Sequence, residues 1–285
     1  MIPSEVYHPA QFSIAEGPVW HEGSLFWVDI PSGVLHRVAA GIADSRDCGD
    51  LLGAAVPTSD GRWLLARRDG FFFLDWESGA LEFISNPRAE NSETRFNDGK
   101  CDPRGRFWAG TMAIDGSPGK GSLYCLDRAL PAREVFDGVS ISNGLAWSTD
   151  QTRFYYIDSL TRRIDLFDYD AESGSISNRR IFRTIPKEYG IPDGMCIDEN
   201  GNLWVAFWGG SAVRCFDGTT GEELAQISVP ATQVSSCCFG DGNELFITTA
   251  RCELSETAME EQPLAGSIFR AAPGVSGPPP RIFQL

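Results

Sequence analysis

Short apolar runs alternate with polar turns along almost the whole chain, and the pattern is clearest between residues 191 and 206. Met195 to Asp198 and Leu203 to Ala206 are apolar segments of strand length. Glu199-Asn200-Gly201, which lies between them, has the composition of a tight turn. Asp193-Gly194 comes directly before the first segment. This arrangement predicts a β-hairpin that opens on an acidic residue.

The same unit occurs six times. The second apolar segments of the six copies align on Phe26, Trp63, Phe107, Phe154, Leu203 and Leu245. Successive copies lie about 37 to 49 residues apart, and such a period with several strands per unit is typical of a β-propeller. The sequence therefore predicts an all-β fold, with residues 1–285 forming one six-bladed β-propeller domain.

Two segments compete for the outer place in the last blade. Residues 5–14 alternate weakly and precede the first copy, and residues 281–285 form the other candidate. We expect the N-terminal segment to complete the last blade, which would join the two ends of the chain. The polar stretch from Arg251 to Leu264 predicts one or two helical turns.

Composition narrows the classes of partner and compartment. The formal net charge of −15 disfavours nucleic acid and anionic membranes as partners and favours cations. None of the eight cysteines forms a Cys-x-x-Cys pair, and no apolar stretch approaches membrane-spanning length. The first residues lack a basic segment followed by an apolar run. We therefore expect a cytoplasmic, monomeric protein with reduced thiols.

The first strand of each blade lines the central channel of a propeller, so the residue just before it is expected to face one mouth of that channel. At this position the six copies hold Glu16, Ala54, Asp98, Asn143, Asp193 and Ser235. Four of these side chains offer a carboxylate or amide oxygen, and a ring of oxygens suits a hard divalent cation such as Ca²⁺. The alternative is that Asp-Gly and Asn-Gly only make turns. That alternative accounts poorly for Glu16, because Glu is not a turn residue.

Arg95 and Asn97 precede the third ring position. A guanidinium and an amide suit hydroxyl-rich or oxyanionic ligands, although Arg95 could equally pair with the ring carboxylates. The signatures G-x-S-x-G and G-x-G-x-x-G are absent. The sequence therefore gives no support to a nucleophile-elbow hydrolase or a Rossmann enzyme.

Five motifs in order resemble the SMP-30/gluconolactonase family, which includes regucalcin and bacterial sugar lactonases. The motifs are Glu16-Gly17-Pro18, Arg95-Phe96-Asn97-Asp98-Gly99-Lys100 with Ala109-Gly110-Thr111-Met112, Ile141-Ser142-Asn143-Gly144, Phe154-Tyr155-Tyr156-Ile157-Asp158-Ser159, and Ile191-Pro192-Asp193-Gly194-Met195. The resemblance spans nearly the whole chain and implies a six-bladed propeller, in agreement with the repeat count.

The resemblance also implies one divalent metal ion, held by Glu16, Asn143 and Asp193. Ca²⁺ is the first expectation, and Zn²⁺, Mn²⁺ or Mg²⁺ is compatible with the same ligands. Arg95 and Asn97 would contact the substrate. Asp115 matches a further family carboxylate, at a position where regucalcins have a Glu.

The activity implied by the family is hydrolysis of a sugar-acid lactone to the open aldonic acid. Asp193 would be the catalytic residue, because it would both touch the metal and orient or deprotonate the attacking water. A metal-dependent organophosphate hydrolase and a non-enzymatic calcium-binding propeller remain alternatives. Specificity is expected from loop 113–121, linker 85–94 and the indole of Trp208.

Overall fold

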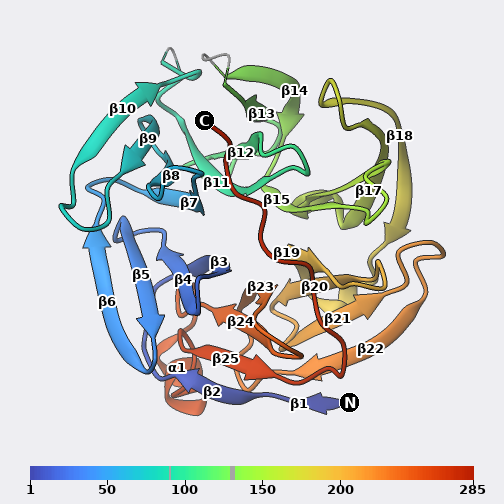
Figure 1. Cartoon of the computed structure of the whole chain (residues 1–285). Coiled ribbons are helices and arrows are strands. Elements are labelled where there is room, and N and C mark those ends of the chain that lie inside the picture. The colour runs from blue at the N-terminus through green and yellow to red at the C-terminus, as the bar shows by residue number, and fades with distance from the viewer. Residues whose placement is uncertain (90, 129–131) are drawn as a thin grey trace.

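Six small sheets are arranged as blades around a central axis (Figure 1). The computed structural model describes residues 1–89, 91–128 and 132–285, so linker 85–94 lies partly outside the described residues. Each sheet is an antiparallel meander that begins at the axis, and one parallel strand is added at the rim. The predicted six-bladed β-propeller is confirmed.

The first three blades each contain four strands, which follow one another from the axis outward. Blade one holds β3 (Ala15–His21), β4 (Ser24–Asp29), β5 (Val34–Ala39) and β6 (Ile42–Asp47). Blade two holds β7 (Leu52–Pro57), β8 (Trp63–Arg67), β9 (Gly70–Leu74) and β10 (Leu81–Ser85). Blade three holds β11 (Thr94–Cys101), β12 (Phe107–Ala113), β13 (Gly121–Leu126) and β14 (Arg133–Val139).

Blade four holds β15 (Ser142–Trp147), β16 (Arg153–Asp158), β17 (Arg163–Asp170) and β18 (Ser175–Thr184). Blade five holds β19 (Ile191–Ile197), β20 (Leu203–Trp208), β21 (Ala212–Phe216) and β22 (Glu223–Ser228). Blade six holds β23 (Val234–Phe239), β24 (Leu245–Thr249) and β25 (Ile268–Ala271). The helical segments are η1 (Ser159–Thr161), η2 (Lys187–Tyr189) and α1 (Glu256–Glu261), the last within the stretch expected to form a helical turn or two.

The N-terminal segment closes the ring, as expected. β2 (Glu5–His8) pairs antiparallel with β25 as the outer strand of blade six, and β1 (Ile2–Pro3) pairs parallel with β22. Near the axis, Ser235 Oγ donates to the carbonyl of Ala15 at 2.6 Å, which joins blade six to blade one. The N-terminal strands therefore join the two ends of the chain at the outside of the propeller, and the Ser235 contact joins them near the axis.

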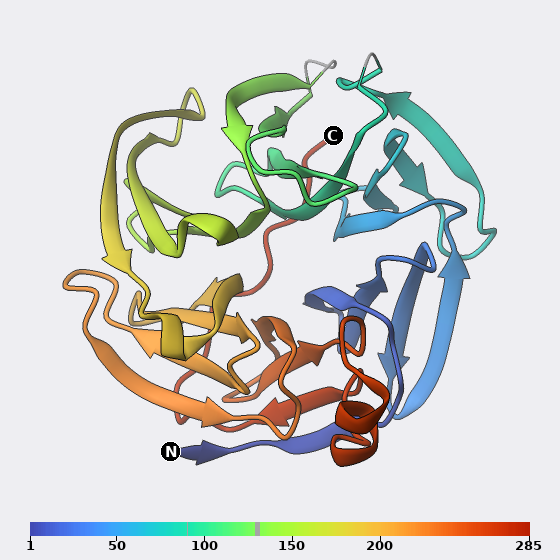
Figure 2. The same ribbon diagram turned by 180° about the vertical axis from the view of Figure 1, so that it is seen from behind.

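The C-terminal segment takes another path and crosses one end of the channel (Figure 1). Its anchor is Phe283, which is 2 % exposed, packs with the cluster between blades two and three, and bridges Thr58 in parallel. Figure 2 shows the opposite end of the channel, over which this segment does not pass. Under Pro278–Pro280 lies a cavity of about 370 Å³. The two ends of the channel are therefore structurally different.

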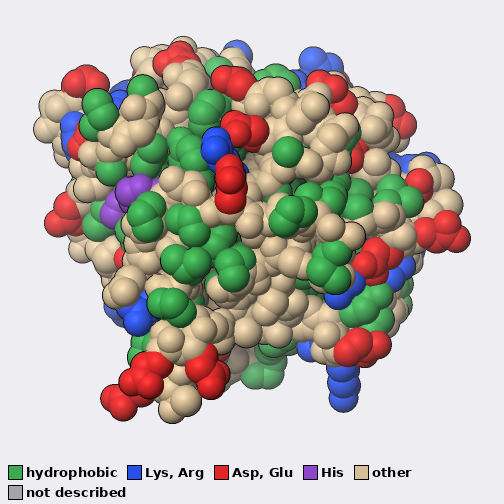
Figure 3. All heavy atoms as spheres, turned by 90° about the horizontal axis from the view of Figure 1, so that it is seen from below, with side chains coloured by type: hydrophobic (Ala, Val, Ile, Leu, Met, Phe, Trp, Pro, Cys, Tyr) green, Lys and Arg blue, Asp and Glu red, His purple; other side chains and the backbone are tan. Residues whose placement is uncertain are grey.

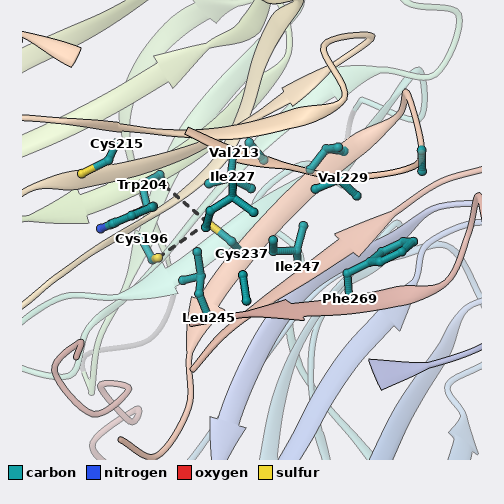
Figure 4. Close-up of a cluster of buried hydrophobic side chains, with 14 of the residues drawn as sticks. Cys196, Trp204, Val213, Cys215, Ile227, Val229, Cys237, Leu245, Ile247 and Phe269 are labelled. Carbon is teal, nitrogen blue, oxygen red and sulfur yellow. Dashed lines mark hydrogen bonds between the residues drawn. The ribbon is translucent and has the colours of Figure 1, made fainter. Parts of the chain in front are cut away.

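The core lies between neighbouring blades. Alternate residues of each strand face the adjacent sheet, so apolar side chains from two blades interdigitate. Figure 4 shows the cluster between blades five and six, where Trp204, Val213 and Ile247 pack around Cys196 and Cys237. Those two thiols lie 3.6 Å apart, and all eight cysteines are free.

The first hairpin turns of blades three and five each contain a buried aspartate at the same position. Asp198 accepts the indole N–H of Trp204 at 3.0 Å and the backbone N–H of Asn202 at 2.8 Å. Asp102 accepts the indole N–H of Trp108 in the same way, also at 3.0 Å. The run 198–202 is therefore a hairpin turn, as its composition predicts.

The surface is mixed in character. On the face seen in Figure 3, acidic and basic side chains are scattered among neutral and hydrophobic ones. Within the described residues, no helix is both long and apolar enough to cross a membrane.

Candidate active site at one mouth of the channel

In every blade, the pairing between the innermost strand and the second strand is interrupted near the expected ring residue. The register shifts once between the first and second strands of each blade, between Glu16 and Val19 in blade one and at the matching place in the other five. The ring residues therefore lie inside the strands and not just before them, which corrects the expectation. β-Bulges re-aim side chains, and here they lie where the candidate site residues are.

The register also corrects the membership of the ring. The pairs Ala15↔Asp29, Phe96↔Thr111, Ser142↔Asp158 and Pro192↔Phe207 occupy the same level of their blades. The next residue in each first strand is Glu16, Asn97, Asn143 and Asp193. Asn97, and not Asp98, is therefore level with the other three, and Gly53 replaces Ala54 in blade two by the same count. Asp98 lies one residue deeper in the channel.

Asn143 is held in one orientation by its neighbours. Its Nδ2 donates to Ser159 Oγ at 2.8 Å, and Ser159 Oγ in turn donates to the carbonyl of Pro192 at 2.8 Å. Its Oδ1 accepts from Asn97 Nδ2 at 3.1 Å. Because the amide nitrogen is committed to Ser159, the oxygen is the atom that remains to act as an acceptor or ligand.

Glu16 and Asp193 are buried, at 4 % and 8 % exposed. Burial, followed by the charge of Asp98, raises the pKa of Glu16 to about 8. Burial also raises the pKa of Asp193 well above its usual value, with further contributions from the charges of Glu16 and Asp98. The site therefore concentrates carboxylates that repel one another in a medium that solvates charge poorly.

Arg95 lies at the rim beside this cluster. Its Nη1 donates to Asn97 Oδ1 at 2.7 Å and to the carbonyl of Phe96 at 3.0 Å. Burial lowers the pKa of Arg95 to about 10, opposed by the negative charges of Glu16 and Asp193. The guanidinium is therefore close enough to the carboxylates to feel their charge, while its hydrogen bonds orient Asn97.

Asp115 is placed differently. It lies exposed in the loop after β12, where its Oδ1 accepts the backbone N–H of Ser117 at 2.9 Å. The hydrogen bond from Ser117 lowers the pKa of Asp115. Among the described residues, no hydrogen bond joins Asp115 to Arg95 or Asn97, so it is the one predicted site residue that is not drawn into the cluster.

Two further residues lie beside the site: Asp98, which was expected at the ring level, and Cys252, which was not predicted. Asp98, 4 % exposed, raises the pKa of both Glu16 and Asp193. Cys252 lies near Asp193 and Arg95, and burial raises the pKa of its thiol to about 12, which disfavours the reactive thiolate. The Asp-Gly pair signalled Asp98, whereas nothing in the local sequence signals Cys252.

The donor set fits a divalent cation. Two buried carboxylates with raised pKa and an amide oxygen of fixed orientation are hard oxygen ligands, and a cation would relieve the repulsion between the carboxylates. No group of three or more His, Cys, Asp or Glu in metal-binding arrangement occurs among the described residues. The third protein ligand of such a site would therefore have to be the amide of Asn143.

Comparison with known proteins agrees with the propeller fold. Residues 14–251 match the profile described as SMP-30/Gluconolactonase/LRE-like region. The chain is 41 % identical to regucalcin of Danio rerio and 40 % identical to the putative sugar lactone lactonase YvrE of Bacillus subtilis, in each case over 95 % of this chain and 94 % of the relative.

A solved structure named as a calcium-binding protein, regucalcin, from Agrobacterium tumefaciens superposes with a TM-score of 0.94. That structure is 27 % identical to this chain, and the match covers 100 % of this chain and 99 % of the other. The profile match alone covers most of the six blades. The repeat, the ring of side-chain oxygens and these likenesses together show that the chain belongs to the SMP-30/gluconolactonase family.

Proposed function

We propose that this protein hydrolyses the lactone of a sugar acid to the open aldonic acid in a reaction that depends on a divalent metal ion. The observation that carries the proposal is the linked set Arg95–Asn97–Asn143, which lies at the same mouth as the buried carboxylates of Glu16 and Asp193. Hydroxyl-binding donors and metal-binding oxygens thus adjoin one another. A lactone with ring hydroxyls and a polarisable carbonyl needs both.

The residues divide between two tasks. Glu16, Asn143 and Asp193 would hold the cation, which when bound supplies a Lewis acid for the lactone carbonyl. Arg95 and Asn97 would bind ring hydroxyls and fix the lactone over the channel. Ca²⁺ suits these oxygen ligands, as do Mn²⁺, Mg²⁺ and Zn²⁺.

Asp193 is the proposed catalytic residue. Water adds to the carbonyl carbon, the bond from that carbon to the ring oxygen breaks, and the water proton passes by way of the Asp193 carboxylate to the ring oxygen. The carboxylate is buried at the mouth, where bulk water competes little for its lone pairs. A carboxylate that also binds a cation is a weaker base, so orientation of the water is the larger part of its role.

The test is direct. Purified protein with Ca²⁺, Zn²⁺ or Mn²⁺ should open gluconolactone, xylonolactone or arabinolactone faster than the spontaneous reaction. A phosphotriester assayed in parallel separates lactonase from organophosphate hydrolase. Opening at the spontaneous rate with every metal would refute the proposal.

A calcium-binding role without catalysis is the second candidate, favoured by the naming of the Agrobacterium tumefaciens structure as a calcium-binding protein. Such a role needs Glu16, Asn143 and Asp193 but gives Arg95 no task. Calcium titration of Arg95→Ala, beside its lactonase rate, distinguishes the two candidates. Loss of rate with calcium binding retained indicates the enzyme.

A further inference from the structure

Arg95 has one polar counterpart on the rim of the mouth. Arg95 lies two residues before the ring position of its blade. The residues two before the ring position in the six blades are Ile14, Leu51, Arg95, Ile141, Ile191 and Gln233. Four of the six are apolar, and Arg95 already reaches toward the carboxylates. Gln233 is therefore the second side chain at this level that can make directed hydrogen bonds.

The amide oxygen of Gln233 is buried without a partner. The residue is 8 % exposed, and no described residue donates a hydrogen bond to its Oε1. The backbone carbonyl of Gln233, by contrast, does have a partner, since it accepts a hydrogen bond from the N–H of Ala250 at 2.9 Å. A buried acceptor without a donor costs stability, so an unpaired one at the rim of a site indicates a donor that arrives from outside.

Trp208 lies beside this acceptor. Trp208 and Gln233 form an isolated antiparallel bridge between blades five and six, and residues opposite one another in such a bridge present their side chains on the same face. Trp208 is only partly buried. A β-carbon placed on Gly209 would lie 4.0 Å from the Gln233 Oε1, in ordinary van der Waals contact, so the chain at Gly209 passes directly beside the amide.

Arg95, Gln233 and Trp208 offer three different kinds of contact to a ligand. Arg95 offers only donors, whereas the Gln233 Oε1 offers an acceptor, and the indole of Trp208 offers a flat apolar face. A sugar ring has hydroxyl donors at its edge and an apolar C–H face. Arg95 on blade three and Gln233 on blade six therefore offer a polyhydroxylated ligand complementary hydrogen-bonding groups, donors from one and an acceptor from the other.

We propose that the Gln233 Oε1 accepts a hydrogen bond from one ring hydroxyl of the sugar lactone, while Trp208 packs against the ring, so that Gln233 determines which hydroxylated lactones are accepted. This inference rests on the proposed lactonase function and extends it to specificity. Gln233 acts in binding, and the bond-breaking steps remain with the residues beneath it.

The test combines Gln233→Met with a series of gluconolactones that each lack one hydroxyl. The substitution removes the acceptor at nearly constant length. For gluconolactone it should raise KM about fivefold with kcat nearly unchanged, because a neutral hydrogen bond contributes about 1 kcal/mol. For the one deoxy-lactone that lacks the partner hydroxyl, the substitution should leave KM unchanged. Gln226→Met, on the outer strand β22, is the matched control and should match wild type throughout.

Thermal melting of the ligand-free protein separates binding from a structural role. If Oε1 is unpaired in the free protein, Gln233→Met removes that cost and melts at or above the wild-type temperature. A lower melting temperature, or an unchanged KM across the whole series while wild type is active, would overturn the inference.

Failure of the proposed function can be recognised separately. If the wild type opens no lactone, titration with D-gluconolactam, which keeps the hydroxyls and resists hydrolysis, tests the contact alone. A Kd about fivefold higher in Gln233→Met than in wild type would support the contact. Equal affinity, or no binding to either protein, would contradict it.

Discussion

Replacing Ser159 by alanine removes the hydroxyl that orients the Asn143 amide. Two hydrogen bonds are lost, because Ser159 Oγ accepts from Asn143 Nδ2 and donates to the Pro192 carbonyl, both at 2.8 Å. Asn143 is 3 % exposed, so water does not readily replace the lost partner. A buried donor left unsatisfied costs about 1–3 kcal/mol, and we expect the free energy of unfolding to fall by that amount.

The same substitution should weaken metal binding, although Ser159 is not itself a proposed ligand. Without the hydroxyl the amide can rotate and present its nitrogen to the site. Loss of a group that orients a ligand typically lowers metal affinity about 10- to 100-fold. Calorimetric titration with Ca²⁺ or Mn²⁺ measures the affinity, and urea unfolding of the metal-free protein measures the stability.

Two control variants make the result interpretable. Ser159→Thr keeps the hydroxyl and should retain most of the affinity. Ser173→Ala alters an exposed turn of blade four and should change neither quantity. If Ser159→Ala lost stability but bound the cation as tightly as wild type, the Asn143 oxygen would not be a ligand, and the proposed ligand set would be wrong.

The remaining predictions concern charge, substrate and specificity. Burial raises the pKa of Glu16 to about 8 in the folded protein, against 4.5 for the ordinary side chain, so between these pH values the metal-free folded state binds a proton that the unfolded state has lost. The stability of the metal-free protein should therefore fall as pH rises from 4.5 to 8. Melting curves across this range, with and without Ca²⁺, should show the fall and its relief by the metal. Glu16→Ala should lose most metal binding by titration, whereas Asn143→Asp, which keeps three oxygen ligands, should retain it. Arg95→Ala should lower kcat/KM for lactones by about 100-fold or more with metal content unchanged, and an unaltered rate would contradict its substrate role. Asp115→Ala should change the ranking of pentono- and hexonolactones more than it changes metal affinity, and an unchanged ranking would place specificity elsewhere.

The ring residues were only partly predictable from the sequence. Aligning the turns identifies Glu16, Asn143 and Asp193, but it places Asp98 at the level that Asn97 occupies. A sequence signal for the correct register is present. Blades three and five share an Asp-x-x-Gly-x-x-Trp turn at Asp102 and Asp198, and counting five residues back from each gives Asn97 and Asp193. Because the Asp-Gly pair at 98–99 resembles the other ring pairs, an alignment on that pair shifts blade three by one residue.

The sequence by itself determined the six-bladed fold, because hairpin turns and two-residue alternation are local properties that repeat whether or not the ring has closed. It also determined the residue types available at the ring. Only the tertiary structure decided which of them act together. The raised pKa values of Glu16 and Asp193 depend in part on charges from other blades, and the Asn143 amide is fixed by Ser159 of its own blade and by Asn97 of blade three. The Gln233 oxygen is buried without a partner, which the sequence does not show. Burial and charge depend on distances in space, and closure of the ring through β2 and β25 sets those distances for residues far apart in the chain.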